Sequence, residues 1–505
     1  MSAPPIRGRR PRFWWIAAFL LLSSAACSFI LHHGTSQCDT DTDCEKFGSH
    51  PSCQNGVCVS SGLGPAACSY FTPPAAPVQP EDFRNQCSTA ACVPFDNCVR
   101  LGVCGDAGPP IVLPEAAAPT PPVDSGNTTP TYPKCVDPSA GRGNVVFISG
   151  SSTWPPLMKK LAPIVIANGG PVPVFQTTSS CGAVASIYNG TPMVDPSPGS
   201  SASYAQYFGA DGTAVNCLLG SVGMPVDIGA SDVYAASCGF VTDTGPTDHP
   251  GAIQAIAFVV PSTSSETAIS AEAAREVFGL GGNDGGTSPW IDPTRYFVRN
   301  ATAGSQQMIA RAIQVSPNEV WGQDQGTATK LVSNMELLLM SQADPAIGFV
   351  SVTTYDPARG KLRALAYQDW GQDCAYLPDS TKDSMDKQNV RDGHYPIWGP
   401  IHFLTPQQPS DAAASFLQIV ALPVPTTALV DAYVASSMVP TCAMGVQRAG
   451  MTDIGPLSAY TPPVSCGCYF DSTTGGAPAN CVSCTSSSMC PAGRTNCNLG
   501  YCEIE

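Results

Sequence analysis

Four short stretches of this chain combine hydroxyl groups, glycines, two carboxylates and one arginine in a pattern suited to binding an oxyanion. They are Gly150 to Trp154, Ser180 to Gly182, Asp227 to Asp232, and Arg299 to Ser305. Most of them place small residues where a strand is expected to turn into a helix, so that unpaired backbone N–H groups and the positive end of a helix dipole face the same point. No G-x-S-x-G or similar nucleophile motif accompanies them. The sequence therefore predicts binding and not catalysis, and a phosphatase is disfavoured.

Asp232 is the unusual member of this set, because a carboxylate repels a fully ionised oxyanion. It does accept a hydrogen bond from an oxyanion that still carries a proton, and this favours hydrogen phosphate over sulfate. Arg299 offers a planar fork of donors to two oxygens. Each residue also has an ordinary interpretation: a surface or capping role for Asp232, a salt bridge for Arg299, helix N-caps for Thr153 and Ser180, and core packing for Trp154. The occurrence of the four stretches in series favours the ligand role.

The elements that must position these residues lie between Asn144 and about Tyr460, where short β-branched runs alternate with helical stretches. We expect strands at 145–148, 172–175, 253–260 and 347–352, and helices at 157–167, 270–278, 306–313 and 327–340. Such alternation predicts an α/β body in which helices cover mainly parallel sheets. With just over three hundred residues, this body is expected to form two lobes.

In this order the segments resemble the phosphate-binding proteins of ABC importers, which have the two-lobed type II periplasmic solute-binding fold. The resemblance covers about residues 144–445 and includes Asp344-Pro-Ala-Ile-Gly-Phe-Val350 and a return strand at 395–401. It implies a body at 141–460, with lobe 1 at about 141–250 plus 395–460 and lobe 2 at about 251–394. It also implies no cofactor and no metal, inorganic phosphate or a similar oxyanion as ligand, an ABC transporter permease as partner, and the ligand residues Thr153, Trp154, Ser180, Asp232, Arg299, Gly304 and Ser305.

Two positions depart from the pattern of that family. Ala303-Gly304-Ser305 stands where the family has Ser-Gly-Thr, so one hydroxyl donor is missing, and Thr302 is a candidate replacement. Ala301 stands where many members have an acid that orients the arginine, which predicts a less fixed Arg299. These departures leave open a protein of another class, a surface protein that keeps the fold for sensing, adhesion or assembly.

Cysteines gather outside the predicted body, which indicates disulfides and an oxidising compartment. Of 23 cysteines, Cys38, Cys44, Cys53 and Cys58 are spaced much like Cys484, Cys490, Cys497 and Cys502, so the modules at 27–68 and 461–505 are expected to be copies. A third cluster and a Pro/Ala-rich linker occupy 69–140. All three clusters are expected to be spacers or protective caps. Within the body, an insertion between Gly190 and Pro225 carries Cys217. With Cys181 and Cys238 nearby, one disulfide is expected to tie this insertion to the ligand lobe, and the sequence leaves the pairing open.

The N-terminus has the composition of an export signal, with Arg7 to Arg12, an apolar run at 13–22 and small residues before Cys27. Residues 1–26 resemble a bacterial lipoprotein signal in which Cys27 is lipidated, although Ser24 stands where such signals usually have Leu; ordinary signal-peptidase cleavage is the alternative. This predicts an extracytoplasmic protein, in the periplasm or at the cell surface, anchored to the membrane through lipid. The formal net charge of -15 argues against nucleic acid as a partner.

Overall fold

The computed structural model describes most of residues 144–504 and parts of the chain before them. The described earlier residues are 42, 52–54, 57–59, 80–86, 88, 90–101 and 131–135; short gaps later fall at 198–199, 201, 221, 242–244, 282–286, 339, 422–424, 451 and 476–479. Cys27 and the predicted signal segment lie outside the described residues. None of the helices in the described part of the chain has the length and apolar character needed to cross a lipid bilayer.

The chain divides into two compact units, Met1–Ser61 and Gly62–Glu505. In the first unit, strand β1 (Ser52–Gln54) pairs antiparallel with β2 (Val57–Val59), and Cys53 lies opposite Cys58 in the register. The second unit contains the predicted body, which the following paragraphs describe.

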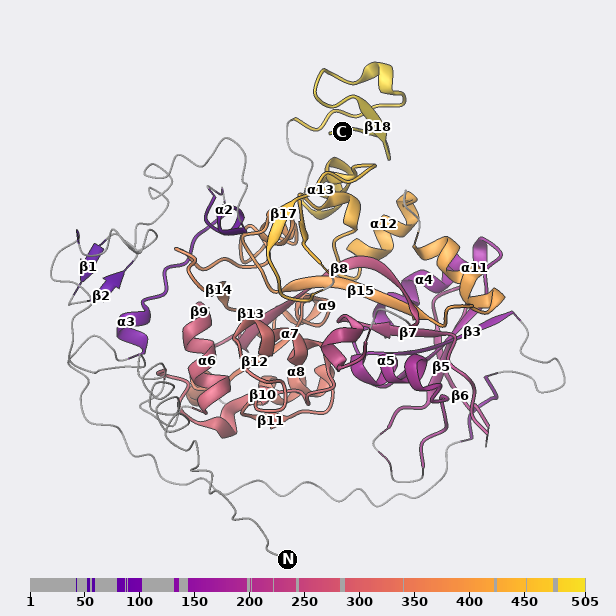
Figure 1. The fold of residues 1–505 in the computed structure, drawn as a ribbon, viewed down its shortest axis with the longest axis horizontal. Coiled ribbons are helices and arrows are strands. Elements are labelled where there is room, and N and C mark those ends of the chain that lie inside the picture. Colours follow the sequence, from indigo (N-terminus) through magenta and orange to yellow (C-terminus); the bar gives the residue numbers. More distant parts are fainter. Residues whose placement is uncertain are drawn as a thin grey trace, which may run out of the picture. The chain divides into compact units, whose positions relative to one another are not determined.

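A mixed sheet of eleven strands, counted over the described residues, forms the centre of the second unit (Figure 1). Its strands are β3 (Val145–Gly150), β4 (Val172–Thr177), β5 (Ala205–Phe208), β6 (Ala214–Cys217), β7 (Ile228–Ser231), β8 (Thr247–Pro261), β10 (Tyr296–Val298), β11 (Gln323–Asp324), β12 (Ile347–Ser351), β13 (Leu362–Ala364) and β15 (Trp398–Thr405). They follow the order β11-β10-β12-β8-β15-β7-β3-β4-β5-β6, with β13 also paired to β8. Smaller two-stranded sheets join β9 (Ala268–Ser270) to β14 (Ala366–Gln368) and β16 (Val446–Arg448) to β17 (Leu457–Ala459).

Strand β8 is shared by the two halves of this sheet. Its first part, up to Ala255, pairs with β15, whereas its second part, from Ile256 to Pro261, pairs with β12 and β13. The first half therefore contains β15, β7 and β3 to β6, and the second half contains β10 to β13. This mixed architecture confirms the predicted α/β class.

The prediction of mainly parallel sheets was wrong. In the eleven-stranded sheet, parallel pairs are confined to β3 with β4 and β7, and to β10 with β11 and β12; the small sheet of β9 and β14 is also parallel. Strands β8 and β15 run antiparallel to their neighbours because both carry the chain between the two halves in opposite directions. The insertion adds a further antiparallel hairpin, β5–β6, at the edge of the sheet.

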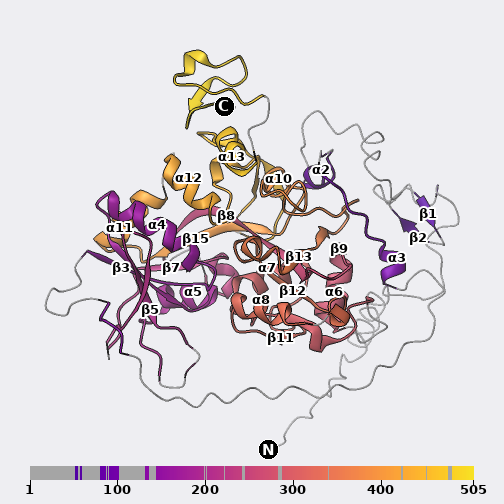
Figure 2. The same ribbon diagram turned by 180° about the vertical axis from the view of Figure 1, so that it is seen from behind.

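Helices cover both faces of the first half. One face packs against α4 (Pro155–Ala167), α11 (Asp411–Val420) and α12 (Thr427–Val434), and the other against α5 (Ser180–Asn189) (Figure 2). The alternation of side chains along β3 explains this sandwich. Ile148 packs among the residues of α4 and α11, whereas Phe147 packs with Val174 and Met193 on the opposite face.

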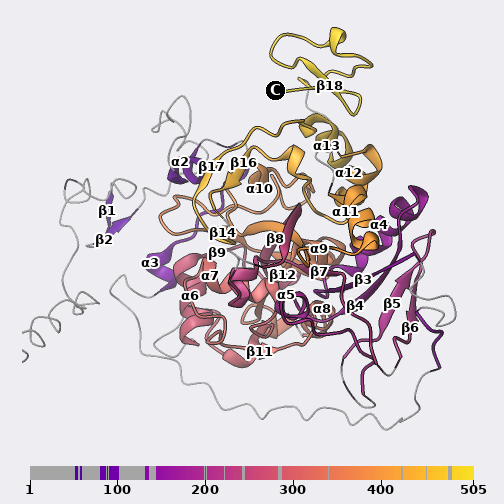
Figure 3. The same cartoon turned by 45° about the vertical axis from the view of Figure 1, so that its right-hand side comes forward.

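The second half is covered by α6 (Ala271–Leu280), α7 (Gly304–Ala312) and α8 (Ala328–Glu336) (Figure 3). Ser270 caps α6 as predicted, because its hydroxyl accepts from the N–H of Ala273 at 3.1 Å. Helix α8 begins after its cap, Thr327, but ends before the predicted residue 340. Leu337 and Met340 are 79% and 78% exposed, so no buried face remains to extend the helix. Short helices α9 (Val352–Tyr355) and α10 (Gln388–Asp392) complete this region.

Two of the cysteine-bearing segments pack against the body and are not spacers. The segment with α2 (Pro80–Asn85) and α3 (Asn97–Arg100) is joined to the body by the disulfide Cys92–Cys374, and Phe83 is buried in the main core. Near the C-terminus, α13 (Gly467–Thr474) buries Phe470 in the same core beside the disulfide Cys442–Cys466. The cysteine spacing was visible in the sequence, but the surface against which each segment packs was not; for Cys92 the partner Cys374 lies 282 residues away.

The last hairpin pairs β18 (Asn496–Asn498) with β19 (Tyr501–Glu503), and Cys497 lies opposite Cys502 as Cys53 lies opposite Cys58. This shared register supports the prediction that the two modules are copies. In the C-terminal module the disulfides join Cys484 to Cys497 and Cys490 to Cys502.

The insertion is fixed differently from the prediction. Cys217 bonds to Cys135, while Cys181 and Cys238 bond to each other. Cys217 meets Cys135 because β6 lies at the sheet edge, where the segment before the body runs beside it. There Leu218 donates a backbone hydrogen bond to the carbonyl of Pro133 and accepts one from the N–H of Cys135.

Candidate functional site

Asp232 lies at the centre of the predicted site residues of the first half. It follows β7 directly and is 2% exposed. Its Oδ1 accepts from Trp154 Nε1 at 2.9 Å, its Oδ2 accepts from Ser180 Oγ at 3.2 Å, and Thr153 Oγ1 lies 3.2 and 3.3 Å from the two oxygens. Because β3, β4 and β7 are parallel neighbours, the residues that follow them meet at one edge of the sheet. Four of the seven predicted residues are thus in contact.

The ordinary capping roles for Thr153 and Ser180 do not hold. Helix α5 is capped by Ser179, whose hydroxyl accepts from Gly182 N–H at 2.9 Å, so the Ser180 hydroxyl is left for Asp232. Helix α4 has Trp154 at its N-cap position without any side-chain cap bond. Trp154 packs edge-to-face on Phe403, with ring centroids 5.1 Å apart, and also donates from Nε1 to Asp232.

Arg299 enters the site from the second half, directly after β10. It is 6% exposed; its Nη2 donates to the carbonyl of Gly326 at 2.8 Å and its Nη1 lies 3.5 Å from Ser152 Oγ, while its buried Nε has no partner. Burial lowers the pKa of Arg299, and the negative charges of Asp324 and Asp232 oppose that shift.

Sequence reasoning missed two neighbours of Arg299. The Gly326 carbonyl accepts a hydrogen bond from its Nη2, and the negative charge of Asp324 acts on the guanidinium. The sequence does contain Asp324, a carboxylate at the end of the short strand β11. Its position beside Arg299 depends on the pairing of β11 with β10, which exists only in the folded sheet.

The N-terminus of α7 completes the site with Gly304 and Ser305. Its N-cap residue, Ala303, makes no side-chain cap bond, and Ser305 is 6% exposed. A Cβ atom on Gly304 would lie 2.5 Å from Ser180 Oγ and 2.7 Å from Asp232 Cβ, so the two halves of the sheet bring these residues into direct contact.

Thr302 does not replace the missing hydroxyl of this turn. It is exposed, and its Oγ1 is bonded to Asn300 Oδ1 at 2.6 Å. Its carbonyl instead accepts from the N–H of Cys181 at 3.0 Å and links the two halves. The structure thus places all seven predicted residues around one point, with one hydroxyl fewer than the family pattern would supply.

Burial raises the pKa of Asp232, and hydrogen bonds from Ser151, Trp154, Ser180 and Thr153 oppose this shift. Ser151 was not predicted; its hydroxyl lies 3.1 Å from Thr153 Oγ1. A carboxyl group whose pKa is raised by folding binds its proton more tightly in the folded state. The resulting stabilisation is fully present below the ordinary pKa of 3.8 and is lost as the pH rises through the raised value.

Asp232→Asn is therefore expected to flatten the decrease in stability with rising pH that begins near pH 3.8. Chemical unfolding of the oxidised protein at a series of pH values measures this slope. Asp383→Asn, at an exposed carboxylate paired with Lys382, is the control and keeps the wild-type slope. An unchanged slope in Asp232→Asn contradicts the buried, proton-binding carboxyl described above.

The buried arginine and the hydroxyl and backbone donors around it suit the binding of an anion. Within the described residues, the single cluster with metal-ligand spacing consists of Cys484, Cys490 and Cys502, and all three are disulfide-bonded. Three histidines contact polar groups other than the seven predicted residues: His394 and His402 bond to Asp392 and Asp248 at 2.7 and 2.8 Å, and His249 lies 3.3 Å from Thr405 Oγ1. We assign them structural roles.

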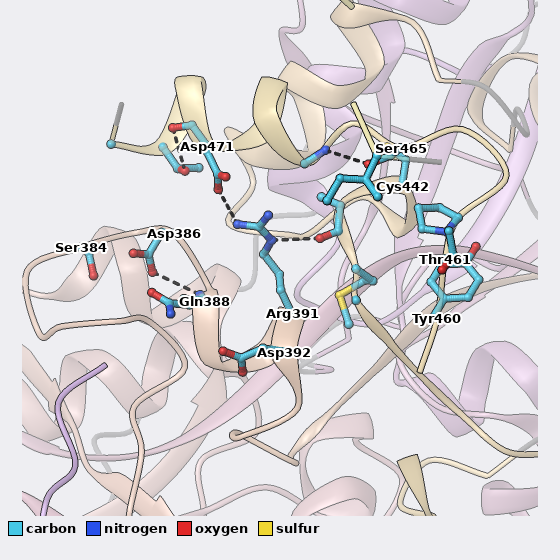
Figure 4. A pocket seen from close by; sticks show the side chains of 18 residues that line it. Ser384, Asp386, Gln388, Arg391, Asp392, Cys442, Tyr460, Thr461, Ser465 and Asp471 are labelled. Carbon is cyan, nitrogen blue, oxygen red and sulfur yellow. Dashed lines mark hydrogen bonds and ion pairs between the residues drawn. The ribbon is translucent and has the colours of Figure 1, made fainter. Parts of the chain in front are cut away.

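A cavity of about 820 Å³ lies away from these residues, beside α10 and α13 (Figure 4). Its lining includes Arg391, which is paired with Asp471 and donates from Nε to the Ala443 carbonyl at 2.9 Å. Asp386 and Asp392 add two further carboxylates, so the lining has more negative than positive groups. Like charges repel an anion. None of the seven predicted residues lines this cavity, and it is a poor candidate for an oxyanion site.

No protein-family model matches the chain. Among solved structures, it is similar to one from Clostridium perfringens that is named as a phosphate ABC transporter substrate-binding protein with bound phosphate, at 14% identity and a TM-score of 0.40, over 59% of this chain and 100% of that one. It is also similar to an ABC-type phosphate transport receptor from Vibrio cholerae, at 14% identity and a TM-score of 0.36, over 58% and 99% of the two chains. A Corynebacterium glutamicum OxyR mutant matches at 10% identity and a TM-score of 0.33, over 58% and 65%. At sequence identities this low, the ligand has to be inferred from the side chains of this chain and not from the similar structures.

Proposed function

We propose that this chain is an extracytoplasmic solute-binding protein that binds an oxyanion, inorganic phosphate, between the two halves of its sheet. It would deliver the anion to the permease of an ABC importer and perform no chemistry on it. In this role the body acts as two lobes that close on the ligand and remove it from water. Lobe 1 comprises residues 141–250 and 395–460, and lobe 2 comprises residues 251–394.

The observation that carries the proposal is that a buried arginine and a buried carboxyl group come together where the two halves meet. Arg299 presents a buried Nε without a partner, and its charge interacts with that of Asp232. The uncapped first turn of α7 adds backbone N–H donors and the positive end of a helix dipole. Unpaired buried donors cost free energy, and an oxyanion would satisfy several of them together.

Phosphate is favoured over sulfate because the site contains one buried acceptor among its donors. At neutral pH phosphate keeps a proton that it can donate to Asp232, whereas sulfate has none. With sulfate bound, the buried acceptor Asp232 receives no hydrogen bond from the ligand, and this lowers the affinity for sulfate. Thr153, Trp154, Ser180 and Ser305 would line the same site.

The cellular location follows from the disulfides and from the N-terminal sequence. Seven disulfides among the described residues fit an oxidising compartment. We place the protein outside the cytoplasm, in the periplasm or at the cell surface, anchored to the membrane through lipid on Cys27. Mass spectrometry of the mature N-terminus tests the anchor.

Isothermal titration of the oxidised protein lacking residues 1–27 with phosphate, sulfate and arsenate tests the binding function. Phosphate is expected to bind and sulfate to be excluded. Asp232→Asn, which exchanges one acceptor oxygen for an N–H donor, is expected to reduce the ratio of phosphate to sulfate affinity by about tenfold or more, because an unpaired buried group costs about 1–3 kcal/mol. Equal selectivity in the wild type and this variant would remove the reason for proposing phosphate.

A surface protein used for sensing, adhesion or assembly is the alternative function. It is favoured by the disulfide-stapled segments beyond the sheet, including Cys92–Cys374 and the C-terminal hairpin with Cys490–Cys502. If no oxyanion binds in the titration, the surface-protein function becomes the better-supported proposal.

A further inference from the structure

We infer that Trp154 is the specificity-determining residue of the proposed site, because its indole N–H keeps Asp232 a hydrogen-bond acceptor while the hydroxyls of Thr153 and Ser180 turn to the ligand. This inference rests on the proposed function and concerns how the same site distinguishes a protonated oxyanion from a fully ionised one.

The carboxylate of Asp232 is surrounded by side-chain donors of the protein itself. A carboxylate offers about four acceptor positions, two on each oxygen. Trp154 Nε1 donates to Oδ1 at 2.9 Å, Ser180 Oγ donates to Oδ2 at 3.2 Å, and the single proton of Thr153 Oγ1 lies between the two oxygens, 3.2 and 3.3 Å from them. These three donors leave about one acceptor position, and rotation of either hydroxyl gives a ligand P–OH group a second one.

The two hydroxyls are able to turn away. The proton of a Ser or Thr hydroxyl rotates about a single bond and takes whichever acceptor is near. Thr153 Oγ1 already has a second neighbour in Ser151 Oγ at 3.1 Å, and Ser180 Oγ also accepts from the backbone N–H of Asp232 at 3.2 Å. Each hydroxyl can therefore donate to a ligand oxygen and leave an acceptor position on Asp232 to the ligand proton.

The indole of Trp154 has no such freedom. Its side chain is fully buried, it packs edge-to-face on Phe403, and it lies in the same core cluster as Leu157 and Ile148. Its single N–H has one direction, which is toward Asp232 Oδ1. This hydrogen bond persists when the hydroxyls rotate, so Trp154 is the constant donor to the carboxylate.

A constant donor matters because Asp232 is buried in a place that favours its protonated form. A hydrogen bond to a carboxylate favours the ionised form, and the charged group that faces it from the second half is Arg299, itself influenced by Asp324. Without the indole bond, Asp232 would take up a proton more readily. A protonated Asp232 donates a hydrogen bond to sulfate, and discrimination is lost.

Trp154→Phe removes the donor and keeps an aromatic side chain. We expect the phosphate-to-sulfate affinity ratio to fall about tenfold, and the midpoint of Asp232 titration to rise by about one pH unit, from the usual strength of a hydrogen bond to a charged group. Titration calorimetry from pH 5 to 8 measures the ratio. Carbon-13 NMR of protein labelled at the aspartate carboxyl carbons, with Asp232→Asn for assignment, measures the midpoint without any ligand. Trp154→Met, which also lacks a donor, repeats the test with a different shape.

Trp290→Phe is the matched control, because the Trp290 indole is also fully buried while its Nε1 has no partner. This control is expected to keep the wild-type midpoint and ratio. A wild-type midpoint in Trp154→Phe and Trp154→Met overturns the inference. If the wild type selects phosphate and both variants do so equally well, the inference fails while the proposed function stands. If the wild type binds neither anion, the proposed function fails and the specificity role of Trp154 fails with it.

Discussion

Arg299→Ala is expected to reduce phosphate affinity at least about a hundredfold, the largest effect of any single side chain in the site. The guanidinium is buried, fixed by the Gly326 carbonyl, and has an Nε without a protein partner. Removing one member of a buried, hydrogen-bonded charge pair costs about 2–5 kcal/mol, and every tenfold loss of affinity corresponds to 1.4 kcal/mol. Titration calorimetry measures the change, and sulfate and arsenate binding should be lost as well.

Arg363→Ala is the matched control for this experiment. Arg363 lies in the second half of the sheet and, like Arg299, donates to backbone carbonyls, those of Ser262 and Ser264. Its removal is expected to leave phosphate affinity unchanged. Arg299→Lys keeps the charge and loses the planar fork, so it should recover only part of the affinity. Wild-type affinity in Arg299→Ala would place the anion elsewhere in the molecule.

Gly304→Val is expected to abolish tight binding by holding the two halves apart. The added Cβ would lie 2.5 Å from Ser180 Oγ and 2.7 Å from Asp232 Cβ, and two further methyl groups extend from it. Asp232 is fixed by three side-chain donors, so relief must come from separation of the halves. Small-angle X-ray scattering should show a larger radius of gyration with phosphate present, and calorimetry should show no tight binding.

Gly360→Val controls for the general effect of a valine, because a Cβ at Gly360 meets no atom within 4 Å. This variant should scatter and bind as the wild type does. Wild-type affinity in Gly304→Val would show that ligand binding does not require the contact between α7 and Asp232.

The candidate site was accessible from the sequence because each of its parts is local. Thr153, Ser180, Asp232 and the turn at Gly304 each follow a short apolar run, and parallel strands bring such positions to one edge. The sequence did not reveal what those residues do for one another. The indole bond from Trp154 to Asp232 and the support of Arg299 by Gly326 depend on neighbours in the folded sheet.

The features that escaped prediction are long-range ones. The antiparallel course of β8 and β15 depends on pairing between residues more than a hundred positions apart, as with Trp398 and Ala255. Strand periodicity indicates a strand but not the direction of its partner. Disulfide pairing was equally inaccessible, since spacing did not distinguish Cys135 from Cys181 as the partner of Cys217.

The sharing of β8 between the two halves has a consequence for biosynthesis. Strand β15, which covers the edge of β7, follows the whole second half in the chain. During N-to-C synthesis, β3, β4 and β7 are therefore present while the edge of β7 still lacks its final neighbour. An open strand edge invites wrong pairing with other chains. The growing polypeptide is most exposed to aggregation in this interval, and its yield will depend on how quickly the second half and the returning strand are added.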